Sequence, residues 1–358
     1  MRILLVHPGP EFSVQDMLSG WQEALTELGH TVRVFNTNDR LSVFDAMLVD
    51  MGKKDGEGRP LVRKALTREQ AIELAIAGLY STCYLFQPDL ILVISAFFTS
   101  PDMLDILRSR RHKVVLVHSE CPYQDGDQLT RAAHADFNLV NDPVSLPAFR
   151  ALGVPAGYAP HAYRPRIHKP GPVVPDLACD LSFVGTGYHS RIDFFEAMNL
   201  EGLDVLLAGN WQLLKDRPRS PLAKYLSHDI DMCLTNDETV RVYNSSRAGI
   251  NFYRREGSAD DGAPALQGEA LGPREVEMAA AGCFFLRDPR PEGDELLTML
   301  PTFGSPYEAA ERLRWWLAHD SQREDAARAA REAISDRTFS NNARMLLRLL
   351  DRQPVTIT

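Results

Sequence analysis

Two glutamates stand eight positions apart in this chain, at Glu269 and Glu277, with Gly272 and Pro273 between them. Glycine gives backbone freedom and proline suits the first position of a helix, so this spacing predicts a loop that carries Glu269 and a helix that carries Glu277. The free amides and the dipole at the start of a helix favour negative charge. The pattern therefore predicts a site where a diphosphate or a leaving phosphate lies beside two carboxylates.

A second pattern follows a short apolar stretch, where Gly185, Thr186 and Gly187 lead into a helix that begins near Arg191. Glycines at such a turn let the backbone approach phosphate without interference from Cβ atoms, and the threonine and the arginine can donate to phosphate oxygens. An ordinary tight turn with a surface arginine is the alternative interpretation. A dinucleotide-binding turn would need a third glycine where Ser190 stands, which makes a nicotinamide-dependent oxidoreductase the weakest candidate.

The 358-residue chain is 44% hydrophobic and 24% charged, which predicts two domains with buried cores. Its formal net charge of -9 argues against a nucleic-acid backbone as the main partner, because such binding draws on clustered Lys and Arg. The five cysteines are odd in number and lack a Cys-x-x-Cys spacing, so we expect neither a disulfide framework nor a zinc site. No apolar run is long enough for a signal peptide or a membrane span, and we expect a cytoplasmic protein.

Short apolar strand patterns alternate with amphipathic helical patterns, which is typical of βαβ units and parallel sheets. The first series predicts strands at residues 3–6, 31–35, 90–94, 114–117 and 137–140, and helices at residues 13–28, 68–86 and 101–110. The charged, glycine-containing stretch from Asp50 to Pro60 predicts a mobile loop. We assign residues 1–165 to a doubly wound first domain.

Five prolines between Pro160 and Pro175 indicate a linker, which we assign to residues 166–176. The second series predicts strands at residues 180–184, 204–207 and 248–252, a helix at 192–199 and two helices within 307–331. These elements predict a second doubly wound domain over residues 177–335. Residues 336–358 are expected to form a helix that crosses back to the first domain, because their apolar residues follow a helical stripe.

The Glu-x7-Glu spacing before a small-residue helix end resembles a motif of two-domain GT-B glycosyltransferases. The chain is similar to their spore-maturation-type branch, related to the group 1 (family 4) enzymes, and the resemblance covers most of the sequence. The segments that carry it are Phe183-Val-Gly with Arg191, Leu207-Ala-Gly-Asn-Trp211, Tyr243 to Asn251, Arg274-x-x-Glu277 with Gly282, and Trp315 to Phe339. The resemblance implies a GT-B fold, in which two Rossmann-like, doubly wound α/β domains face each other across a cleft.

The resemblance also implies a nucleoside-diphosphate sugar as the donor, UDP- or GDP-linked, bound by the second domain. Glu269 would then lie near the transferred sugar, and Glu277 would bind the nucleotide ribose. Arg274 would stabilise the charge that develops on the leaving diphosphate. The other residues that we expect to bind the donor are Gly185, Thr186, Gly187, Arg191 and Asn244.

Polar residues at strand ends and at the domain junction are candidates for the remaining chemistry. An inverting enzyme needs a base for the acceptor hydroxyl, which Glu120 or His118 would supply. A retaining enzyme needs less of a base, and His161 would then donate to the sugar or its phosphate. Because the glutamate spacing resembles the retaining class, we favour retention and assign Glu269, His161 and Glu120 to the catalytic site.

Two segments depart from the resembled pattern, Pro160–Tyr163 near the linker and His118–Pro122 after the fourth strand. The acceptor therefore stays open among a glycan, a protein, a small molecule and a modified DNA base. Trp211 and Tyr188 follow strand ends and are candidates to stack on a base or a sugar ring. His168 is expected to face solvent.

The segment from Glu256 to Glu269 predicts a flexible flap whose Asp260 and Asp261 could hold a metal ion. Relatives neutralise the diphosphate with amides and basic side chains, so we expect no metal requirement and no tightly bound cofactor.

These patterns predict a glycosyltransferase that moves a sugar from a nucleotide-sugar donor to an acceptor held mainly by the first domain. A nucleotide-sugar epimerase would share the fold but turn over its donor without an acceptor. A non-catalytic carbohydrate-binding protein would not turn it over at all. The expected partners are the donor, the acceptor and a second copy in a homodimer, without strong nucleic-acid backbone binding.

Overall fold

The structure is a computed structural model that describes residues 1–9, 15–110, 112–226, 228–255 and 267–351. The chain forms two compact units: residues 1–159 with the C-terminal residues from 343 onward make unit 1, and residues 160–342 make unit 2. Residues 256–266 of the expected flap, with Asp260 and Asp261, lie outside the described residues.

Unit 1 is built on a six-stranded parallel sheet with the strand order β2-β1-β5-β6-β7-β8. Its central strands are continuous aliphatic runs buried on both faces, and every residue of β5 is buried. The strands are β1 (Arg2–His7), β2 (Thr31–Asn36), β5 (Leu90–Ile94), β6 (Lys113–Val117), β7 (Phe137–Val140) and β8 (Ala156–Tyr158).

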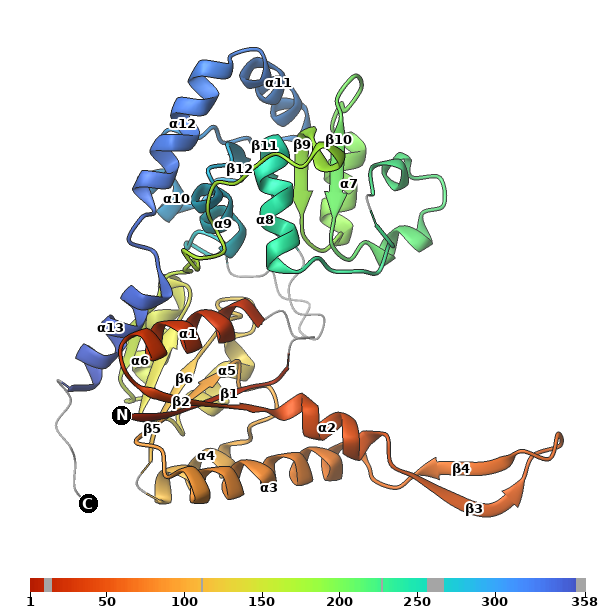
Figure 1. Cartoon of the computed structure of the whole chain (residues 1–358), viewed down its shortest axis with the longest axis vertical. Coiled ribbons are helices and arrows are strands. Elements are labelled where there is room, and N and C mark those ends of the chain that lie inside the picture. The colour runs from red at the N-terminus through yellow and green to blue at the C-terminus, as the bar shows by residue number, and fades with distance from the viewer. Residues whose placement is uncertain (10–14, 111, 227, 256–266, 352–358) are drawn as a thin grey trace. The chain divides into compact units, whose positions relative to one another are not determined.

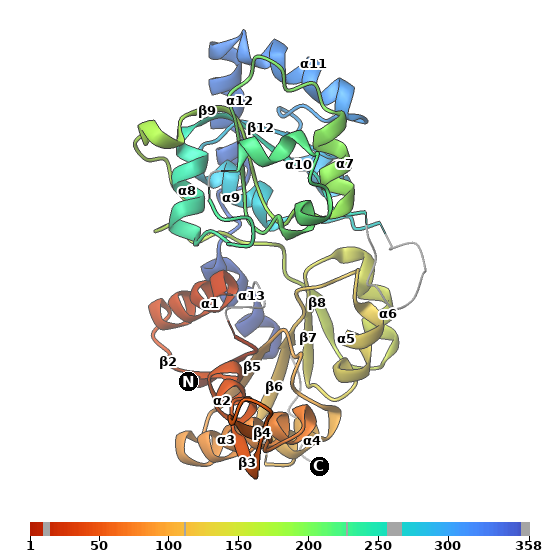
Figure 2. The same cartoon turned by 90° about the vertical axis from the view of Figure 1, so that its right-hand side faces the viewer.

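Helices cover both faces of this sheet, which is the arrangement expected of a doubly wound domain (Figure 1 and Figure 2). Capping residues decide where they begin: the hydroxyl of Thr67 accepts the amide of Gln70 at the start of α3, and Ser100 precedes Pro101 at the start of α4. The helices are α1 (Gln15–Glu27), α2 (Thr37–Asp45), α3 (Arg68–Phe86), α4 (Pro101–Ser109), α5 (Asp125–Ala132) and α6 (Leu146–Ala151), with the short 3-10 helix η2 (Pro143–Ser145).

The prediction of a mobile loop at residues 50–60 is wrong. The chain instead forms an antiparallel hairpin of β3 (Leu48–Lys54) and β4 (Pro60–Lys64), which extends away from the body of unit 1 (Figure 1). The side chain of Asp55 accepts the amides of Glu57 and Arg59 and so closes the turn. Composition suggested a loop because the hairpin buries neither face, so its residues carry no apolar alternation.

Unit 2 contains a four-stranded parallel sheet with the order β10-β9-β11-β12. Its strands are β9 (Cys179–Val184), β10 (Val205–Ala208), β11 (Ser246–Asn251) and β12 (Phe285–Arg287). The helices around it are α7 (His189–Ala197), α8 (Asn236–Ser245), α9 (Pro273–Ala281), α10 (Pro291–Leu296), α11 (Pro306–Leu317) and α12 (Asp320–Ala333), with the 3-10 helices η3 (Pro175–Leu177), η4 (Gln212–Asp216) and η5 (Pro221–Tyr225). Two α/β units with parallel sheets confirm the predicted fold class.

The last helix, α13 (Phe339–Asp351), begins in unit 2 and continues in unit 1 from Ala343 onward. Ala343 and Leu346 are fully buried, and the carbonyl of Leu350 accepts a hydrogen bond from the Lys113 ammonium at 3.3 Å. Among the described residues, no helix combines the length and the apolar character that a membrane crossing requires.

Candidate functional site

The start of α9 is held by a buried side-chain cluster that sequence analysis did not single out. The carboxylate of Glu275 accepts the amide of Gly272 at 2.9 Å and contacts the hydroxyl of Tyr253, which also lies 2.8 Å from that amide. Gly272 has an ordinary φ of -76°, so the position favours glycine for its size: a Cβ there would meet the Tyr253 ring at 3.1 Å. Glu275 has no solvent exposure, and burial raises its pKa to about 7.

One turn further along α9, Glu277 and Arg274 form an ion pair at 2.7 Å. The Glu277 side chain is 6% exposed and that of Arg274 is 35% exposed, so the pair opens to solvent only on the guanidinium side. Although burial opposes the charged form, Glu277 and Tyr243 together hold the pKa of Arg274 above its usual value. The structure thus places two residues of the predicted donor site in one fixed charged pair.

His168 lies beside this pair and is 1% exposed, so the prediction that it faces solvent is wrong. A ring nitrogen of His168 and a carboxylate oxygen of Glu277 lie within 4.8 Å of each other. The Nδ1 atom accepts the amide of Arg164 at 3.1 Å, which leaves the proton on Nε2, and Nε2 has no hydrogen-bond partner among the residues that the structure describes. Burial of His168 comes from tertiary packing, which its polar, proline-flanked neighbours in sequence do not indicate.

Glu269 is held in place through its backbone by Glu292, the second residue of α10. The Glu292 amide donates to the Glu269 carbonyl at 3.1 Å, and the Glu292 carboxylate accepts the amide of Leu271 at 2.7 Å. The other carboxylate oxygen of Glu292 pairs with the guanidinium of Arg337 at 2.7 Å. The turn that carries Glu269 is therefore fixed on both sides by one residue, which no local sequence pattern indicates.

His161 belongs to the same neighbourhood, because the charges that act on it come from Glu292, Glu277 and Arg337. Burial lowers the pKa of His161 to about 4, and this effect outweighs the two carboxylates, which raise it. The imidazole is therefore neutral near pH 7. It can donate or accept one hydrogen bond but cannot supply a positive charge to a phosphate.

The amides of both glycines in the turn after β9 are bonded inside the protein, and Gly187 also has a steric reason to be glycine. The Gly185 amide donates to the Ala208 carbonyl at 2.9 Å and the Gly187 amide to the Asn210 carbonyl at 2.8 Å. A Cβ on Gly187 would lie 2.4 Å from the ring of Trp211, which is fully buried beneath the turn. These two amides are already used inside the protein, so a diphosphate at this turn must be bound by the Thr186 region or by the first turn of α7.

Arg191 is engaged by backbone carbonyls, because its Nε donates to Phe252 and its Nη1 to Thr186, both at 2.9 Å. The guanidinium also lies over the rings of Phe183 and Tyr188. Arg191 thus joins the turn after β9 to the end of β11. This arrangement fixes the guanidinium at the carboxyl edge of the sheet, where the predicted site lies.

Two other predicted ligands lie elsewhere in unit 2. Asn244 stands at the C-terminal end of α8, next to the amino end of β11, and its amide donates to the carbonyl of Lys169 at 3.3 Å. The structure does not bring it to the carboxyl edge. Trp211 has no exposure, so the prediction that it stacks on a base or a sugar is wrong; its ring packs against Phe183 and Phe195 instead.

In unit 1, Glu120 and His118 follow β6 at the carboxyl edge of the sheet. His118 is 4% exposed, donates from Nε2 to Asn138 at 2.9 Å, and has its pKa lowered to about 4 by burial, so it is a neutral core residue. Glu120 is half-buried. Beside them, Ser95 adopts a left-handed φ of 46° and its hydroxyl contacts that of Ser119, a backbone feature that residue types alone do not reveal.

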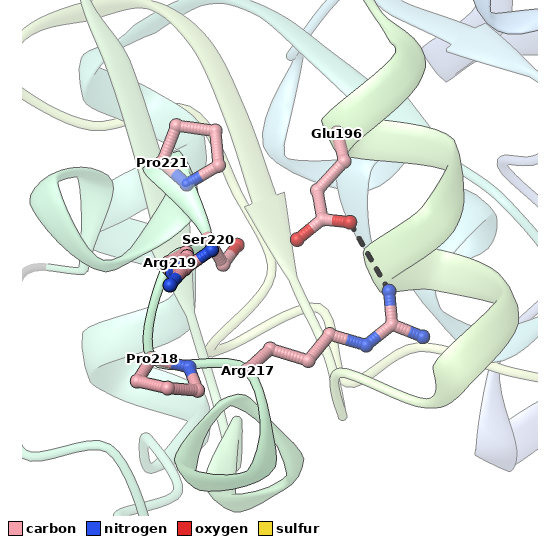
Figure 3. Close-up of a pocket in the computed structure, with 6 residues that line it drawn as sticks. All are labelled: Glu196, Arg217, Pro218, Arg219, Ser220 and Pro221. Carbon is pink, nitrogen blue, oxygen red and sulfur yellow. Dashed lines mark hydrogen bonds and ion pairs between the residues drawn. The ribbon is translucent and has the colours of Figure 1, made fainter.

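Two cavities of about 460 and 430 Å³ lie beside α7, outside the residues discussed so far. The larger is lined by Glu196 and residues 217–221, and Figure 3 shows the guanidinium of Arg217 turned toward the Glu196 carboxylate. Neither lining includes a predicted site residue. The candidate site is therefore defined by side-chain contacts around α9 and not by these cavities.

The chain resembles known proteins in two independent ways. Residues 191–348 match the family described as "Glycosyl transferase-like". The whole chain superposes on a sucrose-phosphate synthase from Thermosynechococcus elongatus with a TM-score of 0.65 and 14% identity, covering 98% of each chain. A search of curated proteins found no match.

Two further solved structures have the same fold. An α,α-trehalose 6-phosphate synthase from Burkholderia multivorans gives a TM-score of 0.61 at 14% identity, with 98% of this chain and 96% of that one covered. A putative UDP-N-acetylglucosamine 2-epimerase from Listeria monocytogenes gives 0.62 at 15% identity, with 98% and 95% covered. The chain therefore has the GT-B fold of these neighbours, and its residues 191–348 are similar to a glycosyltransferase-like family.

Proposed function

We propose that the protein transfers a sugar from a nucleoside-diphosphate sugar, bound by unit 2, to an acceptor bound by unit 1. The observation that carries this proposal is the Arg274–Glu277 pair near the start of α9, in which the carboxylate is buried and the guanidinium is partly exposed. Such a pair offers a carboxylate to ribose hydroxyls and a guanidinium to phosphate at the end of a helix where anions are favoured. The sequence match over residues 191–348 includes both residues and supports the assignment.

In this proposal, Glu277 binds the ribose, and Arg274 binds the diphosphate together with Arg191 and the Thr186 region. Glu269 contacts the transferred sugar near the reacting carbon. His161 is neutral, so it acts as a hydrogen-bond donor and not as a charge. We assign no step to a metal ion, because Arg274 and the helix amides supply positive charge to the leaving group.

We also propose transfer with retention and placement in the spore-maturation-type branch. Support comes from the Glu-x7-Glu spacing and from the Arg274-x-x-Glu277 helix start. A trehalose-6-phosphate synthase with this fold was studied for glycosyl transfer with retention. Glu120 in unit 1 remains the proposed contact for the acceptor hydroxyl.

The donor site is tested by titrating UDP, GDP and ADP into the full chain by calorimetry. We expect one nucleotide to bind, and Glu277→Gln to weaken it about 10- to 100-fold, because a hydrogen bond to a charged group is worth about 1.5–3 kcal/mol. The control is Asp325→Asn, which removes the exposed i,i+3 pair with Arg328 on α12. Equal affinities for the wild type and Glu277→Gln would place the ribose elsewhere.

An epimerase is the second candidate, because the likeness to a putative UDP-N-acetylglucosamine 2-epimerase spans nearly the whole chain. An epimerase would convert its nucleotide sugar in the absence of any acceptor, whereas a transferase releases nucleoside diphosphate. Product analysis of donor incubated alone separates the two. A non-catalytic carbohydrate-binding protein would bind a sugar and leave every donor unchanged.

A further inference from the structure

Glu292 occupies a position from which it can control the geometry of Glu269. Its amide and its carboxylate hold the backbone on the two sides of residue 270, through the Glu269 carbonyl at 3.1 Å and the Leu271 amide at 2.7 Å. A hydrogen bond from an amide to a carboxylate is among the stronger ones in proteins. Rotation of the turn that carries Glu269 must therefore break at least one contact to Glu292.

Glu292 is itself held by Arg337 in a pair whose side chains are only 16% and 14% exposed. Ion pairs with this degree of burial are screened much less than surface pairs, and loss of one partner leaves a poorly hydrated charge. Without Arg337, rotation toward water lowers the free energy of the Glu292 carboxylate. Such a rotation would withdraw its other oxygen from the Leu271 amide.

Arg337 belongs to one of the two segments at which the chain passes between the units. The Arg337 carbonyl accepts the amide of Tyr163 at 2.9 Å, and Tyr163 pairs with Thr338 in a parallel bridge. Close by, the Asn342 side chain donates to the Pro160 carbonyl at 2.8 Å. The two crossing segments, residues 160–163 and 337–342, are thus joined at the residue that holds Glu292.

We propose that Glu292 is a positioning residue for Glu269, and that its pairing with Arg337 makes this positioning depend on the two crossing segments. A change in those segments alters Arg337, which alters Glu292 and then the turn at residues 269–271. The inference rests on the proposed function only in giving Glu269 a role at the transferred sugar. The mechanical link itself involves residues of unit 2 alone.

The link is tested by amide hydrogen exchange of Leu271 in the full chain, measured for the wild type, Glu292→Gln and Arg337→Ala. The Leu271 amide donates to the Glu292 carboxylate, so a faster Leu271 exchange in Arg337→Ala reports transmission through Glu292. We expect an increase of at least tenfold, with the β9 amides of residues 179–184 unchanged and with most of the protection restored in Arg337→Lys. The control Asp294→Asn removes a different ion pair of the same helix, that with Arg287, and should leave Leu271 unaffected.

The consequence for the site is tested with UDP and UDP-glucose as probes. We expect Glu292→Gln to keep the Kd for UDP within threefold of wild type while release of UDP from UDP-glucose slows at least tenfold. Unchanged Leu271 exchange in both variants overturns the inference, as does an increase spread over the whole chain that Arg337→Lys does not reverse. Failure of wild-type protein to bind or turn over a nucleotide overturns the proposed function instead, and the exchange result still decides the positioning.

Discussion

Glu275 should make the stability of unit 2 fall as pH rises, and Glu275→Gln should remove this dependence. The carboxyl is fully buried, and burial raises its pKa from the ordinary value of 4.5 to about 7. A raised pKa means that the folded state holds the proton more tightly than the unfolded state does. The stabilising contribution is therefore complete below pH 4.5 and is lost as pH rises through 7.

The size of the effect follows from the shift. A pKa raised from 4.5 to about 7 corresponds to about 3 kcal/mol, most of which is lost between pH 5 and pH 8. His118 and His161 work in the opposite direction, because burial lowers their pKa values to about 4 and the unfolded state then holds their protons more tightly. Their contribution to stability grows as pH rises from about 4 to 6.5 and is complete above that, so the pH profile of the wild type alone would combine two opposite trends.

The assay is urea unfolding of wild type and Glu275→Gln at pH 5, 6, 7 and 8, followed by tryptophan fluorescence. Three of the four tryptophans, Trp211, Trp315 and Trp316, lie in unit 2, so the signal reports mainly that unit. His118 and His161 are present in both proteins, so their contribution to the pH dependence cancels in the difference in unfolding free energy. We expect it to shift by about 2–3 kcal/mol in favour of the variant from pH 5 to pH 8, and a difference that stays constant with pH would refute the reasoning.

Three further predictions concern other contacts. Arg274→Ala should cost roughly 1–3 kcal/mol in urea unfolding, because Glu277 loses its partner while the exposed side of the pair is already screened; Arg328→Ala is the exposed control, and equal losses would contradict the buried role. Gly209→Ala should lower the free energy of unfolding by about 2–4 kcal/mol, because φ is 108° and a Cβ would lie 2.4 Å from the Gly185 carbonyl oxygen. In the control Gly202→Ala, φ is 73° and the Cβ would lie in open space, so the loss of unfolding free energy should be only about 1–2 kcal/mol. Equal losses in the two variants would show that backbone strain alone, without the clash at Gly185, explains both effects. Leu346→Ala in α13 should cost about 2–5 kcal/mol for its fully buried side chain, whereas an unchanged midpoint would mean that this helix contributes little to stability.

Sequence patterns predicted the structure best where local chemistry decides local structure. The aliphatic run at residues 90–94 predicted β5, and the Gly272-Pro273 pair predicted the start of α9. These features depend on backbone preferences and on side-chain periods of two or 3.6 residues, which act within a few positions. The hairpin at β3 and β4 was missed for the same reason, because neither of its faces is buried and no period marks it.

Local patterns were enough to predict two parallel-sheet α/β units and a helix start between Glu269 and Glu277. The burial of Trp211 and the contacts by which Glu292 holds the Glu269 turn and Arg337 holds Glu292 arise only in the folded chain. The two Glu292 contacts join residues more than twenty positions apart, and their strength comes from burial away from water. No local preference encodes burial of this kind, because it exists only after distant segments have packed together.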